Sequence, residues 1–178
     1  MKKALMAIAV SAMFVTGATL ADTNSPATLS ITGTVTDNTT PVACGVSLST
    51  ASVSLSGMVS SMKTQGQYAS GGTPVALNVT GGAQCDQLVN TNGLAYRFTG
   101  TADDADGNVL ANTATGDNAA AGVGVGVFAI NGAPYSINQG QHNANDTHSF
   151  MLSLVKLTGE TATAGSVQST LTVQLDRL

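Results

Sequence analysis

Apolar side chains in this sequence recur at every second position, and this period of two constrains the fold more than any other feature. Near the end of the chain, for example, Val167, Leu171, Val173 and Leu175 all occupy odd positions. A β-strand places alternate side chains on opposite faces, so the pattern predicts strands with one buried face. By the same rule, strands are expected at 28–36, 51–57, 74–80, 94–100, 122–130, 149–157 and 167–175. Helices are expected to be nearly absent.

Dipeptides that favour turns separate these segments. They are Gly81-Gly82, Asn92-Gly93, Asp106-Gly107 and Asn131-Gly132. Each reaches positive φ at little cost, as tight hairpins require. About seven short strands joined in this way predict an all-β fold, a single antiparallel sandwich of immunoglobulin-like kind. The sequence shows no linker, repeat or second domain.

The first 21 residues have the pattern of a secretory signal peptide. Lys2 and Lys3 precede an apolar run over 4–15, and the small residues Thr19 and Ala21 follow it. The apolar run is shorter than the roughly 20 residues that a membrane-spanning helix needs. We therefore expect cleavage after Ala21 and an exported chain without a membrane anchor.

The charge of the remaining chain excludes one class of partner. Two of the six basic residues lie in the signal peptide, whereas all ten acidic residues lie after it, so the mature chain carries a formal charge of −6. Charged residues make up only 9% of the sequence, against roughly 25% in an ordinary soluble domain. No basic stripe exists that could neutralise phosphates, so nucleic-acid binding is not expected.

The sequence contains only two cysteines, Cys44 and Cys85. In an exported chain the oxidising compartment favours a disulfide between them. A catalytic thiol or a metal ligand is the alternative, but the two residues lack the close spacing of metal-binding cysteines.

Motifs for catalysis or metal binding are missing. The acidic run 103–108 does not have the spacing of a calcium-binding loop and is expected to form a solvated hairpin tip. His142 and His148 are expected to be surface histidines in a polar loop, and no Gly-x-Ser-x-Gly motif is present. We expect no catalytic, cofactor-binding or metal-binding residues and no enzymatic activity. A secreted hydrolase, the alternative, would need a cluster of catalytic groups.

The two ends of the mature chain carry the most specific patterns. Shortly before Cys44, the alternating series Leu29, Ile31, Gly33 and Val35 contains one glycine. Gly165 precedes the last alternating series, which is Leu171, Val173 and Leu175. With the small-residue stretch at 121–125 and the segment 150–164, these features resemble the fimbrial subunits (pilins) of the bacterial chaperone–usher pathway, such as those of type 1 and P pili.

The resemblance implies an incomplete immunoglobulin-like sandwich that is completed by donor-strand exchange. Residues 22–36 would be the donor strand and 37–178 the pilin domain, with Gly165, Leu171, Val173 and Leu175 in the strand that meets the chaperone and borders the groove. The Cys44–Cys85 spacing is also like the disulfide of the family. Arg177 departs from the pattern, because the family usually has an aromatic residue at that position. The alternative, which does not need the resemblance, is that 28–36 is simply the first strand of an ordinary sandwich.

The function implied by the resemblance is structural. The chain would be the major shaft subunit of a fimbrium that supports adhesion to surfaces or host cells, with a minor adaptor or receptor-binding subunit as the alternative. Its partners would be neighbouring fimbrial subunits, a periplasmic chaperone, an outer-membrane usher and a host receptor. It would pass through the periplasm to the extracellular fimbrium, without a cofactor and without inserting into a membrane.

Overall fold

The computed structural model describes residues 27–35 and 43–178, with side chains for the second range. The expected signal peptide, residues 1–21, lies outside the described residues. The elements are β1 (Ala27–Val35), β2 (Gly45–Leu48), β3 (Ser52–Leu55), β4 (Lys63–Thr64), β5 (Thr73–Thr80), α1 (Ala83–Asn90), β6 (Leu94–Gly100), β7 (Leu110–Ala111), β8 (Val123–Ala129), β9 (Pro134–Tyr135), β10 (His142–Asn143), β11 (Ser149–Lys156) and β12 (Val167–Arg177).

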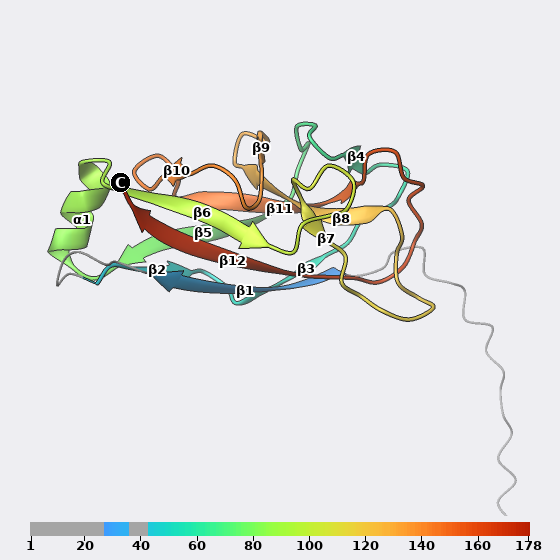
Figure 1. The fold of residues 1–178 in the computed structure, drawn as a ribbon, viewed down its shortest axis with the longest axis horizontal. Helices are drawn as coiled ribbons and strands as arrows, with labels where there is room; N and C mark the ends of the chain where they lie inside the picture. Colours follow the sequence, from blue (N-terminus) through green and yellow to red (C-terminus); the bar gives the residue numbers. More distant parts are fainter. Residues whose placement is uncertain (1–26, 36–42) are drawn as a thin grey trace, which may run out of the picture.

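The strands form two sheets that enclose a common core (Figure 1). The five-stranded sheet has the order β10-β6-β12-β1-β3. The seven-stranded sheet has the order β2-β5-β11-β8-β7, with β4 added beside β11 and β9 beside β8. This all-β arrangement of two sheets confirms the predicted fold class and agrees with an immunoglobulin-like fimbrial fold.

The predicted alternation appears directly in the burial of the strands. In β12, the side chains of Leu171, Val173 and Leu175 are at most 2% exposed, while those between them are less buried. In β5, Val75 and Leu77 are buried and their neighbours are exposed. Because each strand has one apolar face, burying these faces against one another brings the two sheets together.

The alternation of glycine and valine in β8 allows apolar side chains to pack on both faces of its sheet. Val123, Val125 and Val127 lie in the main core. Gly126 makes room on the other face, since a Cβ there would lie 2.7 Å from the ring of Phe128. Phe128 belongs instead to a second apolar cluster with Val109, Val155 and Leu157. The glycines therefore let an aromatic ring lie flat against the strand.

Two of the hairpin turns expected from the sequence are wrong. Asn92-Gly93 connects α1 to β6 and does not join two strands. Gly81-Gly82 does not form a hairpin but leads from β5 into α1, the one helix within the described residues. Gly81 has φ 125° and Gly82 has φ 82°, so both occupy conformations that glycine reaches most easily. A Cβ on Gly81 would also lie 2.8 Å from the Ala43 carbonyl oxygen. The pair is therefore needed where the chain turns sharply beside the disulfide.

The disulfide joins Cys44, just before β2, to Cys85 in α1, with the Cα atoms 5.7 Å apart. Both cysteines are at least 95% buried. The bond attaches the short helix to the beginning of the seven-stranded sheet and confirms the predicted pairing of the two cysteines.

His142 is not the surface loop residue that the sequence suggested. It begins β10, which pairs with β6, and its ring centroid lies 3.8 Å from that of Tyr135 and 5.5 Å from that of Phe98. Its Nε2 atom is buried without a hydrogen-bond partner among the described residues. Burial therefore lowers the pKa of His142 below its ordinary value of 6.5, because the charged form loses its hydration. His148 remains exposed.

The acidic run is also more structured than a solvated hairpin tip. Asp103 is 5% exposed and accepts hydrogen bonds from the backbone N–H groups of Ala105, Asp106 and Val109 and from the Gln65 side chain. Burial opposes ionisation of Asp103, but these hydrogen bonds outweigh it and lower the pKa of the carboxyl group. Asp103 thus organises its own loop and ties it to the segment after β4.

Replacing both Cys44 and Cys85 by serine should lower the free energy of unfolding by about 2–5 kcal/mol, because the open chain gains conformational entropy when it is unfolded. Urea denaturation of the oxidised mature chain and of the double variant measures the difference. An unchanged midpoint and slope would show that the disulfide does not stabilise the fold.

The free energy of unfolding should fall as the pH drops below about 6.5, because His142 takes up a proton more readily in the unfolded chain than in the folded one. Above that pH the residue is neutral in both states and contributes no pH dependence. His142→Phe should reduce the loss between about pH 7 and pH 5 that is measured by urea denaturation. His148→Gln, at an exposed position, is the control, and an equal loss in wild type and His142→Phe would contradict the prediction.

Candidate functional site

The candidate functional site is the slot between β3 and β12. These two strands belong to the same sheet but do not pair with each other, because β1 lies between them (Figure 1). β1 runs parallel to β12 along its full length, from the pair Ala27–Val167 to the pair Val35–Leu175. It runs antiparallel to β3 over its first part, from Ala27–Leu55 to Ser30–Ser52. The slot is therefore bordered by β12 along all of β1 and by β3 along only the first part of it.

The walls of the slot belong to the main core. On β12, Leu171 and Val173 are fully buried and Leu175 is 2% exposed. On β3, Val53 and Leu55 are 4% and 5% exposed. If β1 left the slot, these apolar side chains and the backbone edges of both strands would meet water, which is unfavourable for both.

The register places the residues expected in the donor strand opposite the buried positions of β12. Leu29, Ile31, Gly33 and Val35 pair with Ser169, Leu171, Val173 and Leu175. The side chains of β1 lie outside the described residues, so the backbone register alone makes this match. The sequence thus pointed to this segment, and the structure shows that β12 is the strand beside it.

Gly165 lies where the chain enters β12, and close backbone contacts explain why it is glycine. A Cβ there would lie 2.6 Å from both the Asn118 oxygen and the Ala119 carbonyl carbon. Beside it, Ser166 donates a backbone hydrogen bond of 2.7 Å to Asn118 and accepts one of 3.0 Å from Ala120. Any side chain would push this segment away and shift the start of β12.

Polar interactions hold the other end of β12. Arg97 and Asp176 form an ion pair of 2.8 Å, and Gln141 donates a hydrogen bond of 2.8 Å to the same Asp176 oxygen. Arg177, which replaces the expected aromatic residue, is the last residue of β12 and pairs with Leu94 of β6. The C-terminal end of the strand is therefore attached to β6 by its backbone ladder and by charged side chains.

Sequence reasoning missed the other wall of the slot. Val53 and Leu55 were expected only as alternating residues of a strand at 51–57, and the shorter strand β3 that contains them lies next to β1. The alternating pattern indicated that these residues form a strand, but it did not indicate which strand would pair with it.

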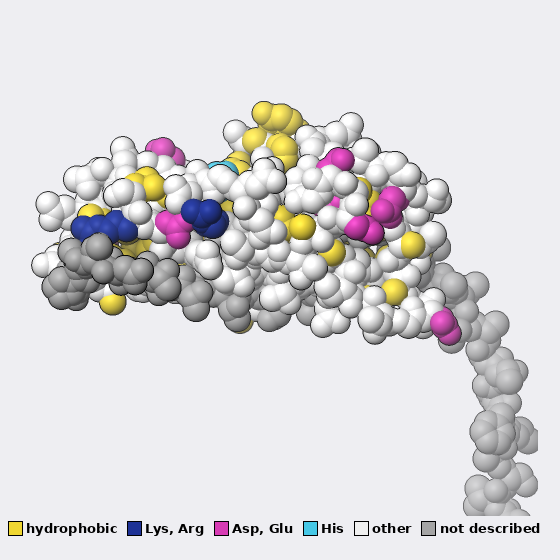
Figure 2. Space-filling model, viewed as in Figure 1, with side chains coloured by type: hydrophobic (Ala, Val, Ile, Leu, Met, Phe, Trp, Pro, Cys, Tyr) yellow, Lys and Arg dark blue, Asp and Glu magenta, His cyan; other side chains and the backbone are white. Residues whose placement is uncertain are grey.

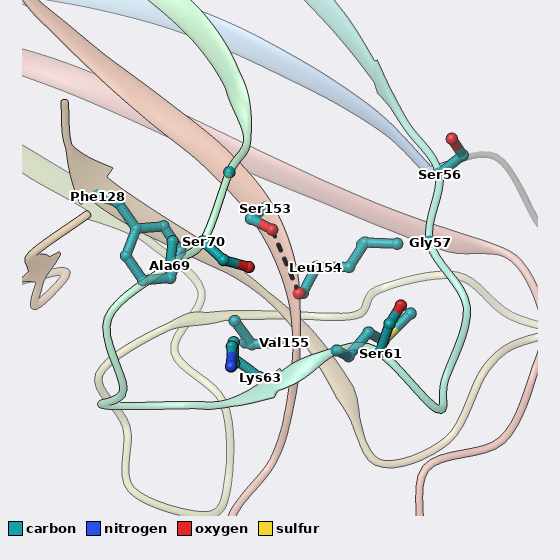
Figure 3. A pocket seen from close by; sticks show the side chains of 12 residues that line it. Ser56, Gly57, Ser61, Lys63, Ala69, Ser70, Phe128, Ser153, Leu154 and Val155 are labelled. Atoms are coloured by element: carbon teal, nitrogen blue, oxygen red, sulfur yellow. Dashed lines mark hydrogen bonds between the residues drawn. The ribbon is translucent and has the colours of Figure 1, made fainter. Parts of the chain in front are cut away.

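Two cavities open on the side of the molecule where β11 approaches the segments around β4. One has a volume of about 240 Å³ and is lined by serine side chains, Lys63 and apolar residues (Figure 3). The other, of about 290 Å³, shares Ser56, Gly71, Ser153 and Leu154 with it. Neither was anticipated from the sequence.

The rest of the described surface offers few charged groups for catalysis. Figure 2 shows charged side chains scattered sparsely over a mostly neutral face. Within residues 27–35 and 43–178, no group of three or more histidine, cysteine or acidic residues is placed to hold a metal ion. In the same part of the chain, no helix has the length and hydropathy to cross a membrane.

Comparison with known proteins agrees with this geometry. The model of one family, described as Fimbrial protein, matches residues 29–176, which include β3 and most of β1 and β12. A search among curated proteins finds no match. The matched range covers nearly the whole sandwich and both strands that border the slot. The chain therefore belongs to the fimbrial protein family and is a structural subunit that assembles with other fimbrial subunits into an extracellular pilus.

Proposed function

We propose that this subunit polymerises by strand addition, with residues 22–36 of one copy filling the slot between β3 and β12 of the next. The single observation that carries the proposal is the position of β1 in that slot, paired on both sides. A strand that is held in the slot by pairing and packing can be replaced by the same strand of a neighbouring copy.

The slot favours an extended strand over any other occupant. Backbone edges border it on both sides over Ala27–Ser30 and on the β12 side over the rest of β1, so the occupant gains ladder hydrogen bonds along these edges. Burying the three apolar anchors Leu29, Ile31 and Val35 contributes roughly 1.5–3 kcal/mol each, or about 5–9 kcal/mol together. Gly33 has the register of Val173, where a residue without a side chain lets the two backbones approach closely.

The structure of the single chain represents the closed form of the subunit in this proposal. β1 belongs to the same chain as the slot and runs parallel to β12. In the fibre, the arriving segment of a neighbour replaces it. The exchange needs no external energy source if the incoming strand makes more favourable contacts than the internal one.

Export and assembly factors follow from the same chemistry. A subunit whose slot is empty exposes an apolar groove and unpaired backbone edges, both of which promote aggregation. We therefore propose that residues 1–21 direct export, that a periplasmic chaperone occupies the slot in transit, and that exchange takes place at an outer-membrane usher. We assign the chain to the shaft, as the major subunit, because it has both a segment to donate and a slot to accept one.

A chain that lacks residues 22–36 should be unstable alone and strongly stabilised by a peptide that spans residues 22–37, because the peptide restores the missing strand. Thermal melting of the truncated chain with and without peptide measures the effect. Size-exclusion chromatography should show oligomers for the full mature chain and none for the truncated one.

The matched control is a peptide of the same composition in which the apolar residues no longer alternate. It should leave the melting temperature of the truncated chain unchanged. A truncated chain that is a stable monomer and indifferent to both peptides would show that the sandwich is complete without β1, and would overturn the proposal.

Replacing Gly33 by leucine should reduce fibre yield while leaving a folded subunit, because the added side chain prevents close approach of the donor backbone in the slot. The yield of surface fibres and the amount of periplasmic subunit are measured together. Thr34→Leu, one position along the strand and on the other face by alternation, is the control and should assemble. Normal fibre yield from Gly33→Leu would contradict the assigned register.

A further inference from the structure

The seven-stranded sheet has a gap along one edge of β11. This edge pairs with β5 from Ser149–Ala76 to Leu152–Thr73, and with β4 from Val155–Lys63 to Lys156–Thr64. Ser153 and Leu154 lie between the two ladders and have no paired residue on this side within the described strands. The two cavities described above open at this interruption, and Figure 3 shows the first of them.

Most of the polar side chains that line the two cavities carry a hydroxyl group. Hydroxyl groups come from both sides of the gap: Ser54, Ser56, Ser61, Ser70, Thr73 and Ser153. Lys63 is the charged residue of the lining, and no carboxylate faces either cavity, although the sequence contains ten acidic residues. Leu154 and Met62 add apolar surface beside these polar groups.

Several of these polar groups are available to a ligand. The Ser61 hydroxyl donates to the Met58 carbonyl oxygen at 3.1 Å, and that of Ser153 is 3.5 Å from the Leu154 carbonyl oxygen. The side chains of Ser56, Ser70 and Lys63, by contrast, make no hydrogen bond or ion pair within residues 43–178. Figure 3 shows the Ser70 hydroxyl pointing toward the space beside Leu154.

Gly71 keeps the two cavities connected. It lines both of them, and a Cβ at this position would meet no atom within 4 Å. Its φ is not positive, so the backbone itself does not require glycine. Gly72 beside it differs, because a Cβ there would lie 2.7 Å from the Leu152 carbonyl oxygen. The absence of a side chain at position 71 therefore leaves open space, although neither the backbone conformation nor a close contact requires glycine there.

We propose that these joined cavities form a binding site for a sugar ring that carries a carboxylate. Serine and threonine hydroxyls both donate and accept hydrogen bonds, as sugar hydroxyls do. The Lys63 ammonium attracts the carboxylate, and apolar side chains contact the C–H groups of the ring. Each cavity is close to the lower end of the roughly 300–1,000 Å³ typical of small-molecule sites, which suits a single sugar ring.

The acidic character of the chain makes Lys63 decisive for an anionic ligand. A mature chain with a charge of −6 repels anions over most of its surface. The site takes no residue from β12 or β1, although one cavity takes Ser54 and Leu55 from β3, which is a wall of the slot. Lys63 and Gly71 lie outside the three strands of the slot, so variants at these two residues test binding separately from assembly.

Ligand-observed saturation-transfer NMR on the mature chain tests the proposal with methyl β-D-glucuronide, methyl β-D-glucoside and acetate. The glucuronide should bind about fivefold more tightly than the glucoside, the factor that an exposed ion pair supplies. Acetate should compete only weakly, because it lacks the ring. Absence of saturation transfer to the glucuronide, or equal competition by acetate, would overturn the proposal. Free glucuronic acid is compared with the methyl glucuronide to identify the source of the ligand. Equal binding of the two indicates a free sugar acid, and weaker binding of the free acid indicates the terminal residue of a glycan.

Variants then test the residues. Lys63→Gln should abolish the preference for glucuronide, Lys63→Arg should restore it, and Lys156→Gln, outside the cavities, should keep it. Gly71→Leu should block both sugars while the melting temperature stays close to that of wild type. A preference that persists in Lys63→Gln, or undiminished binding to a folded Gly71→Leu chain, would overturn the proposal. Each variant should still form oligomers, so a failure here is distinguishable from a failure of strand addition.

Discussion

The structure depends on the pairing of β1 with two strands that cannot pair with each other. β3 and β12 each present a backbone edge and a row of buried side chains to the same slot. Unpaired backbone groups and exposed apolar side chains are both unfavourable in water, so the slot must be filled. The nine-residue strand β1 fills it, so the contact on which the fold depends is the one that another copy would supply in the proposed strand addition.

The rest of the molecule holds the slot in shape. The disulfide fixes the beginning of the seven-stranded sheet to α1, and Phe98 packs against Phe150 of the opposite sheet with ring centroids 5.1 Å apart. At the entry to β12, backbone contacts leave no room for a side chain on Gly165. These contacts do not involve β1, so under the proposed strand addition they would hold the two sheets together while the occupant of the slot is exchanged.

Errors in the sequence-based expectations have a common cause. His142 and Asp103 both lie in polar segments and were expected at the surface, yet one packs on Tyr135 and the other is enclosed by hydrogen bonds from its own loop. Gly81-Gly82 was expected in a hairpin but opens a helix. Local composition describes a segment's preference for water or for a turn, whereas burial depends on residues distant in the sequence, such as Gln65 beside Asp103.

By itself, the sequence indicated seven strand segments and the fold class, because alternation and turn residues act over short distances, but it did not indicate β2, β4, β7, β9 or β10. Leu171, Val173 and Leu175 could be assigned to a buried face from their spacing alone. The tertiary structure decided which strands became neighbours. It placed β1 between β3 and β12 and parallel to β12, and it left β11 unpaired at Ser153 and Leu154 on the side away from β8. Pairing partners are chosen by the packing of whole sheets, and no local pattern encodes that choice.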